Sequence, residues 1–174
     1  HLMRQITASA TYQRSSEPTA SNRRDDQNFS HAIPRRVPAE ALLDSLVQAT
    51  GVPEGFGGAP GGFRAAQLPD ATVENPFLRL FGKPQRMEAC ECERDNSSNM
   101  LQALHFINGK WTLGRLSNPS ARPNQLAANK KTTDEELVTE IYLWSISRRP
   151  REAEMKLGVE FLKSYEKRDE AAQD

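Results

Sequence analysis

The stretch TDEELVTEIYLWSISRRPREAEMKLGVEFLKSYE, residues 133–166, decides the fold. Thr133 followed three residues later by Glu136 forms a capping-box pattern, and apolar residues then recur at helical spacing as far as Trp144. Arg148-Arg149-Pro150 interrupts this pattern, and cations are favourable at the end of a helix. The apolar stripe of a second helix follows, made of Met155, Val159, Leu162 and Tyr165. The sequence therefore predicts a C-terminal αα-hairpin over residues 133–166.

Shorter helical patterns lie towards the N-terminus. Pro38 suits the first turn of a helix because its missing N–H needs no partner there, and Gly51 predicts a left-handed C-cap for that helix. Pro76 and Gly82 bound a shorter pattern in the same way. Further helices are predicted over residues 2–9 and 97–109, the latter capped by Ser97 or Ser98. Residues 110–131 yield no predicted helix.

Two long segments lack any periodicity. Residues 9–36 are dense in polar, turn-prone side chains and predict an extended arm, which Tyr12, Phe29 and Ile33 can fasten to a surface. Residues 51–75 are rich in Gly and Pro and predict a loop, with a brief extended piece over residues 64–69. Strand-like alternation is nearly absent, so the predicted fold class is mainly α: an irregular helical domain with long loops, the extended N-terminal arm and the C-terminal αα-hairpin.

Composition limits the classes of protein that this chain can belong to. Its 174 residues suffice for a single domain, residues 1–174, but a hydrophobic content of 37% predicts an economical core. Lys plus Arg equals Asp plus Glu at 23 each, which argues against a nucleic-acid partner. No apolar run approaches the roughly 20 residues needed to cross a bilayer, so no membrane insertion is expected. His1 and the helical pattern at Leu2 indicate a fragment of a larger protein.

The densest group of reactive side chains is Cys90-Glu91-Cys92-Glu93-Arg94-Asp95. In one interpretation both thiols are small buried groups, while Glu93 and Arg94 form local salt bridges. In a second, Cys90 and Cys92 form a strained, easily reduced disulfide in an oxidising compartment. In a third, the two thiolates begin a soft metal site that His31 and His105 complete, although four ligands are usual and the spacing is not that of a zinc knuckle. The first is favoured, and no metal site is predicted.

A second group of candidate binding residues lies in the arm. The paired guanidinium groups of Arg35 and Arg36 can bind a carboxylate or phosphate of a ligand or of a neighbouring domain, with Asn28 and His31 close by in the chain. Such pairs are more often solvated or bridge to local acids such as Asp25. Glu93 and Arg94 are the further candidates for binding.

Few other residues suggest chemistry. His105 lies among apolar neighbours and is predicted to be a core or half-buried histidine. Trp111 and Trp144 can stack on sugar rings, although tryptophans on apolar faces usually belong to a core. No GxSxG, HExxH or CxxCH signature occurs, so no catalytic residue is assigned and no cofactor is expected in this chain.

Several segments together resemble a known family. They are Thr11-Tyr12-Gln13, Asn28-Phe29-Ser30-His31-Ala32, Arg35-Arg36, Cys90-Glu91-Cys92-Glu93-Arg94, Gln102-Ala103-Leu104 and Arg148-Arg149-Pro150. Their combination and order resemble the domain of unknown function 1553 over nearly the whole chain, with modest departures at Arg14 and Ile33-Pro34. The resemblance implies a C-terminal, extracytoplasmic position in long exported proteins of the planctomycete type. It also implies a helical companion domain and often a separate c-type cytochrome domain, the only place where haem is expected.

Two functions remain open on this basis. The favoured one is a non-catalytic association module that docks onto companion domains of the parent protein or onto a surface or saccharide partner. The long arm, the neutral charge and the missing catalytic signature favour it. The alternative is part of an enzyme or redox site that is assembled with neighbouring domains and uses the Cys90-Cys92 segment.

Overall fold

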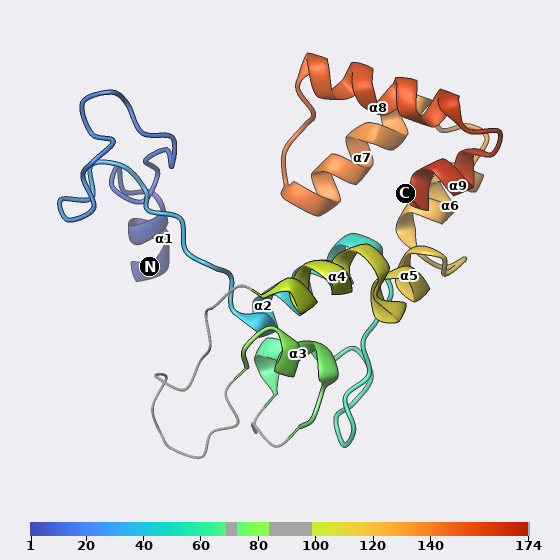
Figure 1. Ribbon diagram of the computed structural model, residues 1–174, viewed down its shortest axis with the longest axis horizontal. Coiled ribbons are helices and arrows are strands. Elements are labelled where there is room, and N and C mark those ends of the chain that lie inside the picture. The colour runs from blue at the N-terminus through green and yellow to red at the C-terminus, as the bar shows by residue number, and fades with distance from the viewer. Residues whose placement is uncertain (69–72, 84–98, 174) are drawn as a thin grey trace. The chain divides into compact units, whose positions relative to one another are not determined.

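The computed structural model describes residues 1–68, 73–83 and 99–173 (Figure 1). No strand occurs within these ranges, so the described chain is mainly α, as predicted. The α-helices are α1 (Leu2–Thr7), α2 (Ala39–Thr50), α3 (Pro76–Leu80), α4 (Met100–Asn108), α5 (Lys110–Leu116), α6 (Arg122–Ala128), α7 (Asp134–Ile146), α8 (Glu152–Ser164) and α9 (Arg168–Gln173). A 3-10 helix, η1 (Ala65–Gln67), lies between α2 and α3. None of the helices in the described ranges is long and apolar enough to cross a membrane.

The chain divides into two compact units, His1–Val37 and Pro38–Asp174. The first holds α1 and the irregular N-terminal arm and is called the arm unit here; the second is called the helical unit. No residue of the arm unit is buried. The helical unit, in contrast, holds two clusters of buried apolar side chains. The buried apolar residues of the described chain therefore all belong to the helical unit.

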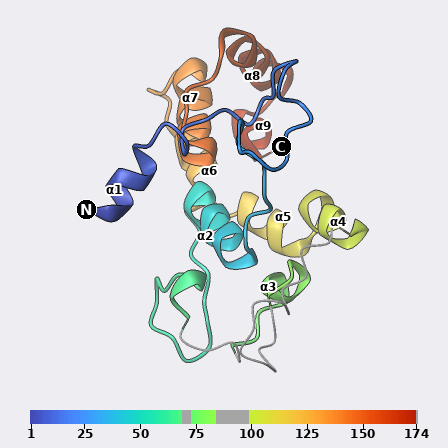
Figure 2. The ribbon, with the colours of Figure 1, turned by 90° about the vertical axis from the view of Figure 1, so that its left-hand side faces the viewer.

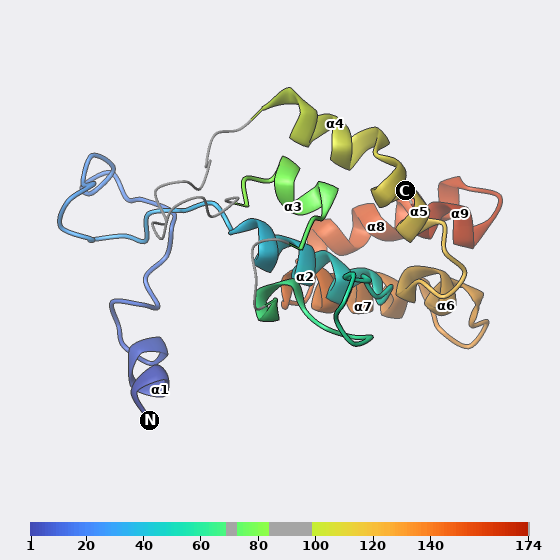
Figure 3. The same cartoon turned by 90° about the horizontal axis from the view of Figure 1, so that it is seen from below.

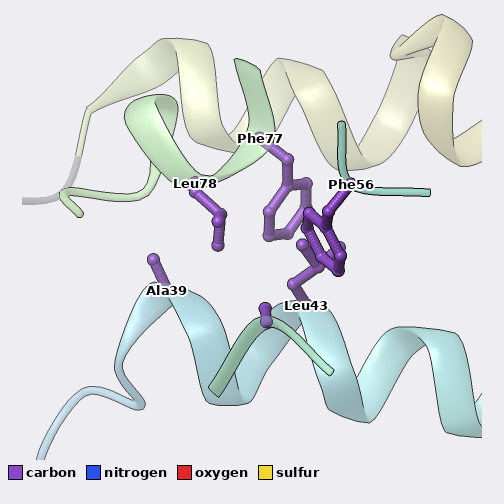
Figure 4. Packing of buried hydrophobic residues seen from close by; sticks show 6 residues of the cluster. Ala39, Leu43, Phe56, Phe77 and Leu78 are labelled. Atoms are coloured by element: carbon purple, nitrogen blue, oxygen red, sulfur yellow. The ribbon is translucent and has the colours of Figure 1, made fainter. Parts of the chain in front are cut away.

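The first cluster lies between α2, α3 and the loop that connects them, as Figure 4 shows. Leu43 of α2 and Leu78 of α3 are completely inaccessible to solvent, and Phe77 of α3 is 1% exposed. Phe56 from the Gly/Pro-rich loop inserts between them and is 7% exposed. Full burial of one large apolar side chain stabilises a fold by about 1.5–3 kcal/mol. This cluster therefore helps to hold in place the glycine-rich loop between α2 and η1.

The loop shows where the helix and turn predictions succeeded and failed. Gly51 ends α2 in the left-handed conformation with φ of 72°, which confirms the predicted C-cap. Pro38 precedes the first helical residue of α2 instead of occupying the first turn. The extended piece predicted for residues 64–69 is wrong over Ala65–Gln67, which form η1, although Arg64 and Leu68 on either side have extended backbone. The Asp44 carboxylate accepts the backbone N–H groups of the first two residues of η1 at 2.7 and 3.1 Å and so stabilises this turn.

The second cluster joins the four C-terminal helices, which Figure 2 shows packed together. Its most buried member is Leu137 of α7, which has no exposed surface. The predicted capping box is confirmed, because the Thr133 side chain accepts the Glu136 N–H and the Glu136 side chain accepts the Thr133 N–H. Near the C-terminus, Arg168 forms an ion pair with Asp134 at 3.0 Å and donates to the Thr132 carbonyl at 2.7 Å. These bonds fix α9 against the start of α7.

Helices α7 and α8 occupy the segment predicted as an αα-hairpin, and they pack against each other. Arg148, in the connection, binds the Glu154 carboxylate in bidentate fashion, with both N···O distances 2.7 Å. The backbone N–H of Arg151 donates to the same carboxylate at 2.7 Å. Arg148 above all, together with this N–H, lowers the pKa of Glu154 from 4.5 to about 2. The ionised carboxylate therefore fastens the connection at neutral pH.

The pKa of Glu154 predicts a specific acid sensitivity. Because it is lower in the folded chain than in the unfolded one, Glu154 contributes stability above a pH of about 4.5, and this contribution is lost as the pH falls towards about 2. Glu154→Gln should therefore show a smaller loss in free energy of unfolding over this pH range than the wild type, measured by urea denaturation. Glu160→Gln, on the exposed side of α8, is the control and should retain the wild-type pH dependence.

Replacement of two helical glycines by alanine should change the free energy of unfolding in opposite directions. Gly158 of α8 lies against Val138 of α7, and an added Cβ would come within 3.0 Å of both Val138 methyl groups. Gly114 of α5 has no neighbour within 4 Å of the same position. Gly114→Ala should raise the free energy of unfolding by about 0.5–1 kcal/mol through helix propensity. Gly158→Ala should lower it by about 1–2 kcal/mol through overpacking. Equal stabilisation by both variants would contradict the close α7–α8 contact.

Candidate binding site

The candidate site in the arm unit is built on a turn around Asp25. One oxygen of its carboxylate accepts the backbone N–H groups of Gln27 at 3.2 Å and Asn28 at 2.7 Å, and the other accepts the Ser30 N–H at 3.2 Å. The Ser30 side chain above all, followed by these backbone donors, holds the pKa of Asp25 well below its usual value. Asp25 is therefore an ionised anchor that orders residues 25–30 from inside the turn.

The turn presents Phe29 to solvent. Its backbone has φ of 53°, in the left-handed region that a bulky side chain rarely adopts, and the residue is 55% exposed. Arg14 fixes this conformation by donating to the Phe29 carbonyl at 2.6 Å. The Ala32 N–H donates to the Ser15 carbonyl at 2.9 Å, so the arm folds back on itself around the turn. The strained conformation is thus maintained by bonds from a distant part of the arm, and it keeps an aromatic ring in water.

The four candidate binding residues of the arm occupy different environments. Asn28 is committed to the turn, because its side-chain amide donates to Asp25 at 3.1 Å. His31 is half-buried, and its Nδ1 is buried without a hydrogen-bond partner. Arg35 and Arg36 are exposed. The two arginines are therefore exposed to solvent, whereas the Asn28 amide takes part in the turn.

The other predicted site residues lie outside the described part of the chain. This holds for Cys90 and Cys92, the redox or disulfide candidates, and for Glu93 and Arg94. Within the described ranges, no group of three or more His, Cys, Asp or Glu side chains could hold a metal ion. His105, the other residue considered as a metal ligand, is half-buried with its ring near those of Phe77, Phe81 and Trp111.

A charged pair that sequence reasoning missed lies beside this aromatic group. Glu54 of the Gly/Pro-rich loop forms a short ion pair with Arg115 of α5, and the two side chains are 15% and 8% exposed. The Trp111 Nε1–H and the Asn75 side-chain amide donate to the two oxygens of Glu54, each at 3.0 Å. The Arg115 guanidinium also donates to the Val52 carbonyl and lies 4.2 Å from the centre of the Trp111 ring. Both oxygens of Glu54 are thus engaged, which makes this pair a structural fastener for the loop.

Trp144 offers only part of its indole ring for stacking on a sugar. It is 38% exposed, so it is less buried than a core tryptophan would be. However, the Arg122 guanidinium lies 3.5 Å from the centre of its ring, and its Nε1–H donates to Glu140 at 3.2 Å. One face of the indole ring is therefore occupied by a cation of the same chain.

The family model PSD1, described as a protein of unknown function (DUF1553), matches residues 1–162. The chain belongs to this family. The match confirms the resemblance found in the sequence, and it spans the whole arm unit and the helical unit as far as α8. No curated protein and no solved structure matches the chain. The description of the DUF1553 family names no activity, so a function has to be inferred from the geometry of the DUF1553 chain itself.

The Glu54–Arg115 pair gives a direct test of how the loop is held. Glu54→Ala leaves the Arg115 guanidinium buried without its counter-charge, and the free energy of unfolding should fall by about 3 kcal/mol or more. Glu140→Ala removes one partly exposed hydrogen bond to Trp144 and should cost at most about 1 kcal/mol. Chemical denaturation, monitored by circular dichroism, measures the free energy of unfolding of both variants. Similar values for both variants would show that Glu54 does not fasten the loop.

Proposed function

We propose that this chain is a non-catalytic association module whose arm unit docks onto a companion domain of its parent protein. The single observation that carries the proposal is that the arm unit is ordered by hydrogen bonds while none of its residues is buried. Fixing the backbone of one residue costs about 1–2 kcal/mol of conformational entropy, which polar contacts in water offset poorly. A surface that covers the apolar side chains of the arm supplies the missing burial.

The exposed side chains of the arm unit suit this role. Its exposed large apolar residues are Leu2, Met3, Ile6, Tyr12, Phe29, Ile33 and Val37. Aromatic side chains inserted into a partner commonly dominate the energy of an interface, and Phe29 is held ready for this by its fixed turn. Because the arm is already restricted before it binds, less conformational entropy is lost on binding.

Charge indicates the kind of surface that the arm fits. The acidic and basic residues of His1–Val37 are Arg4, Arg14, Arg23, Arg24, Arg35 and Arg36 against Glu17, Asp25 and Asp26, so six cations less three anions leave a net charge of +3. Because the whole chain is neutral, the remaining residues carry −3. A companion surface with an apolar centre and an acidic rim therefore complements the arm.

The setting of this association is part of the proposal. The DUF1553 resemblance supports an exported, extracytoplasmic parent protein with a helical companion domain and, in many cases, a cytochrome domain. In that setting the partner is tethered to the arm, so even a weak contact is populated because its effective concentration is high.

The test uses this chain and the remainder of its parent protein, produced as two separate polypeptides and mixed. Titration calorimetry should detect binding, and Phe29→Ala should weaken it about 10–30-fold through loss of the aromatic anchor. Arg35→Glu should also weaken it, with an effect that decreases as salt is added. Two substitutions on the exposed side of α8, Leu157→Ala and Lys156→Glu, are the matched controls and should bind as the wild type does.

Two results would refute the proposal. One is that the two polypeptides do not bind at concentrations up to about 500 μM, which corresponds to less than roughly 5 kcal/mol of binding free energy. The other is that the Phe29 and Arg35 variants bind no more weakly than their α8 controls. Circular dichroism of each variant verifies that the helical unit has remained folded.

A further inference from the structure

Helix α4 directs its polar and aromatic side towards the core. Gln102 is 6% exposed, and its side-chain amide donates to the Leu80 carbonyl at 3.0 Å. The ring of His105 lies 5.5 Å from that of Phe77, and the ring of Phe106 lies 5.2 Å from that of Phe81. These three positions mark the side of α4 that contacts the rest of the helical unit.

The opposite side of α4 is an aliphatic stripe that faces solvent. Successive residues of an α-helix are rotated by about 100°, so Met100, Leu104 and Ile107 share the face opposite Gln102, and Leu101 lies at the edge of that face. The exposed fractions of Met100, Leu101, Leu104 and Ile107 are 78%, 64%, 46% and 66%. In Figure 3, α4 lies at an outer edge of the helical unit. The pattern that normally marks the buried side of a helix is thus turned outwards, which calls for a partner surface.

We propose that this stripe is the interface of a homodimer, in which α4 of a second copy packs against it in antiparallel orientation. A two-fold axis requires a surface that complements itself, and the stripe can meet this requirement because Met100 and Ile107 lie four and three residues away on either side of Leu104. Met100 then lies opposite the partner's Ile107, the two Leu104 side chains meet near the axis, and Asn99 lies opposite the partner's Asn108.

Charge favours a second copy over a charged partner. Residues 99–109 contain no Lys, Arg, Asp or Glu, so the facing helices bring no like charges together. The formal net charge of the whole chain is zero, so two copies do not repel each other at long range. Antiparallel helices also place their dipoles in the favourable relative direction.

The size of the stripe sets the expected strength of the dimer. Four half-exposed to largely exposed aliphatic side chains present on the order of 400 Å² per copy, similar to the largest apolar patch on a typical monomer. Two copies would bury about 800 Å² through these side chains, less than the roughly 1,200 Å² of a stable standard interface. The dimer is therefore expected to be reversible, with half of the chains paired only at tens to hundreds of micromolar.

Sedimentation velocity of the full chain from about 5 to 500 μM tests the proposal. The wild type should shift from monomer towards dimer over this range, and Leu104→Glu should remain monomeric because it places two carboxylates at the axis. Leu157→Glu makes the same change on the exposed side of α8 and should leave the association intact. A wild type that stays monomeric at 500 μM, or a Leu104→Glu variant that associates as the wild type does, would overturn the proposal.

A pair of double variants tests the antiparallel orientation. In M100K/I107E each new lysine faces a glutamate of the other copy, whereas in M100K/I107K lysine faces lysine. At low salt the first should associate at least several-fold more tightly than the second, and this difference should vanish at high salt. Equal association of the two at low salt would exclude the antiparallel pairing. Both variants change exposed positions, so circular dichroism should show unchanged helix content.

This inference is independent of the docking of the arm. Leu104→Glu should bind the remainder of the parent protein as the wild type does, and Phe29→Ala should dimerise as the wild type does. Loss of both associations in either variant would contradict the assignment of the two surfaces to different partners.

Discussion

The carboxylate of Glu54 is the constraint on which the helical unit most depends. It lies in a loop rich in Gly and Pro, whose backbone has little preference for any one conformation. Arg115, Trp111 and Asn75 all donate to it, so one side chain joins the loop to α5 and to the start of α3. With the loop held in this way, Phe56 can enter the core between α2 and α3. Loss of either partner of so enclosed a pair would leave the other charge buried without a counter-charge, which is strongly destabilising.

The same arrangement explains why α4 faces outwards. The aromatic side chains around Phe77 and the amide of Gln102 occupy its inner side, so the aliphatic residues have no core left to enter. The arm unit also exposes an apolar side chain, because its polar bonds fix the backbone while Phe29 stays in water. The arm unit and the outer side of α4 thus keep apolar side chains exposed to water although their backbones are ordered by hydrogen bonds. This combination is typical of proteins that complete their burial by association.

The sequence predicted those elements that depend on local contacts. The capping box at Thr133 and the left-handed Gly51 were found because the residues that form them lie within a few positions of each other. Helix α6 was missed because its sequence is largely polar and its buried residues are only Ala127 and Asn124, the latter donating to the Leu116 and Asn118 carbonyls. Helices α5 and α9 are short and also escaped prediction.

The candidate site could be predicted from the sequence only in part. Asn28 belongs to a polar, turn-prone segment, which cannot show whether its amide serves a ligand or the turn; in the structure the amide donates to the Asp25 carboxylate. Glu54 and Arg115 are 61 residues apart, and no local pattern links them. Periodicity identified α4 and would place its aliphatic stripe against the core, whereas the structure exposes that side to solvent. Hence Met100 and Ile107 could be placed on one face, but that face could not be assigned to solvent.

Hydrogen exchange of the arm provides the most direct measurement of whether this chain is an association module. The amides of Asn28 and Ser30 are bonded to Asp25 in a unit without buried residues, so in the free chain they should exchange by local opening. Addition of the remainder of the parent protein should slow their exchange at least tenfold, while amides in the middle of α8 keep their rates. Unchanged rates at Asn28 and Ser30 under saturating concentrations would contradict the proposed role.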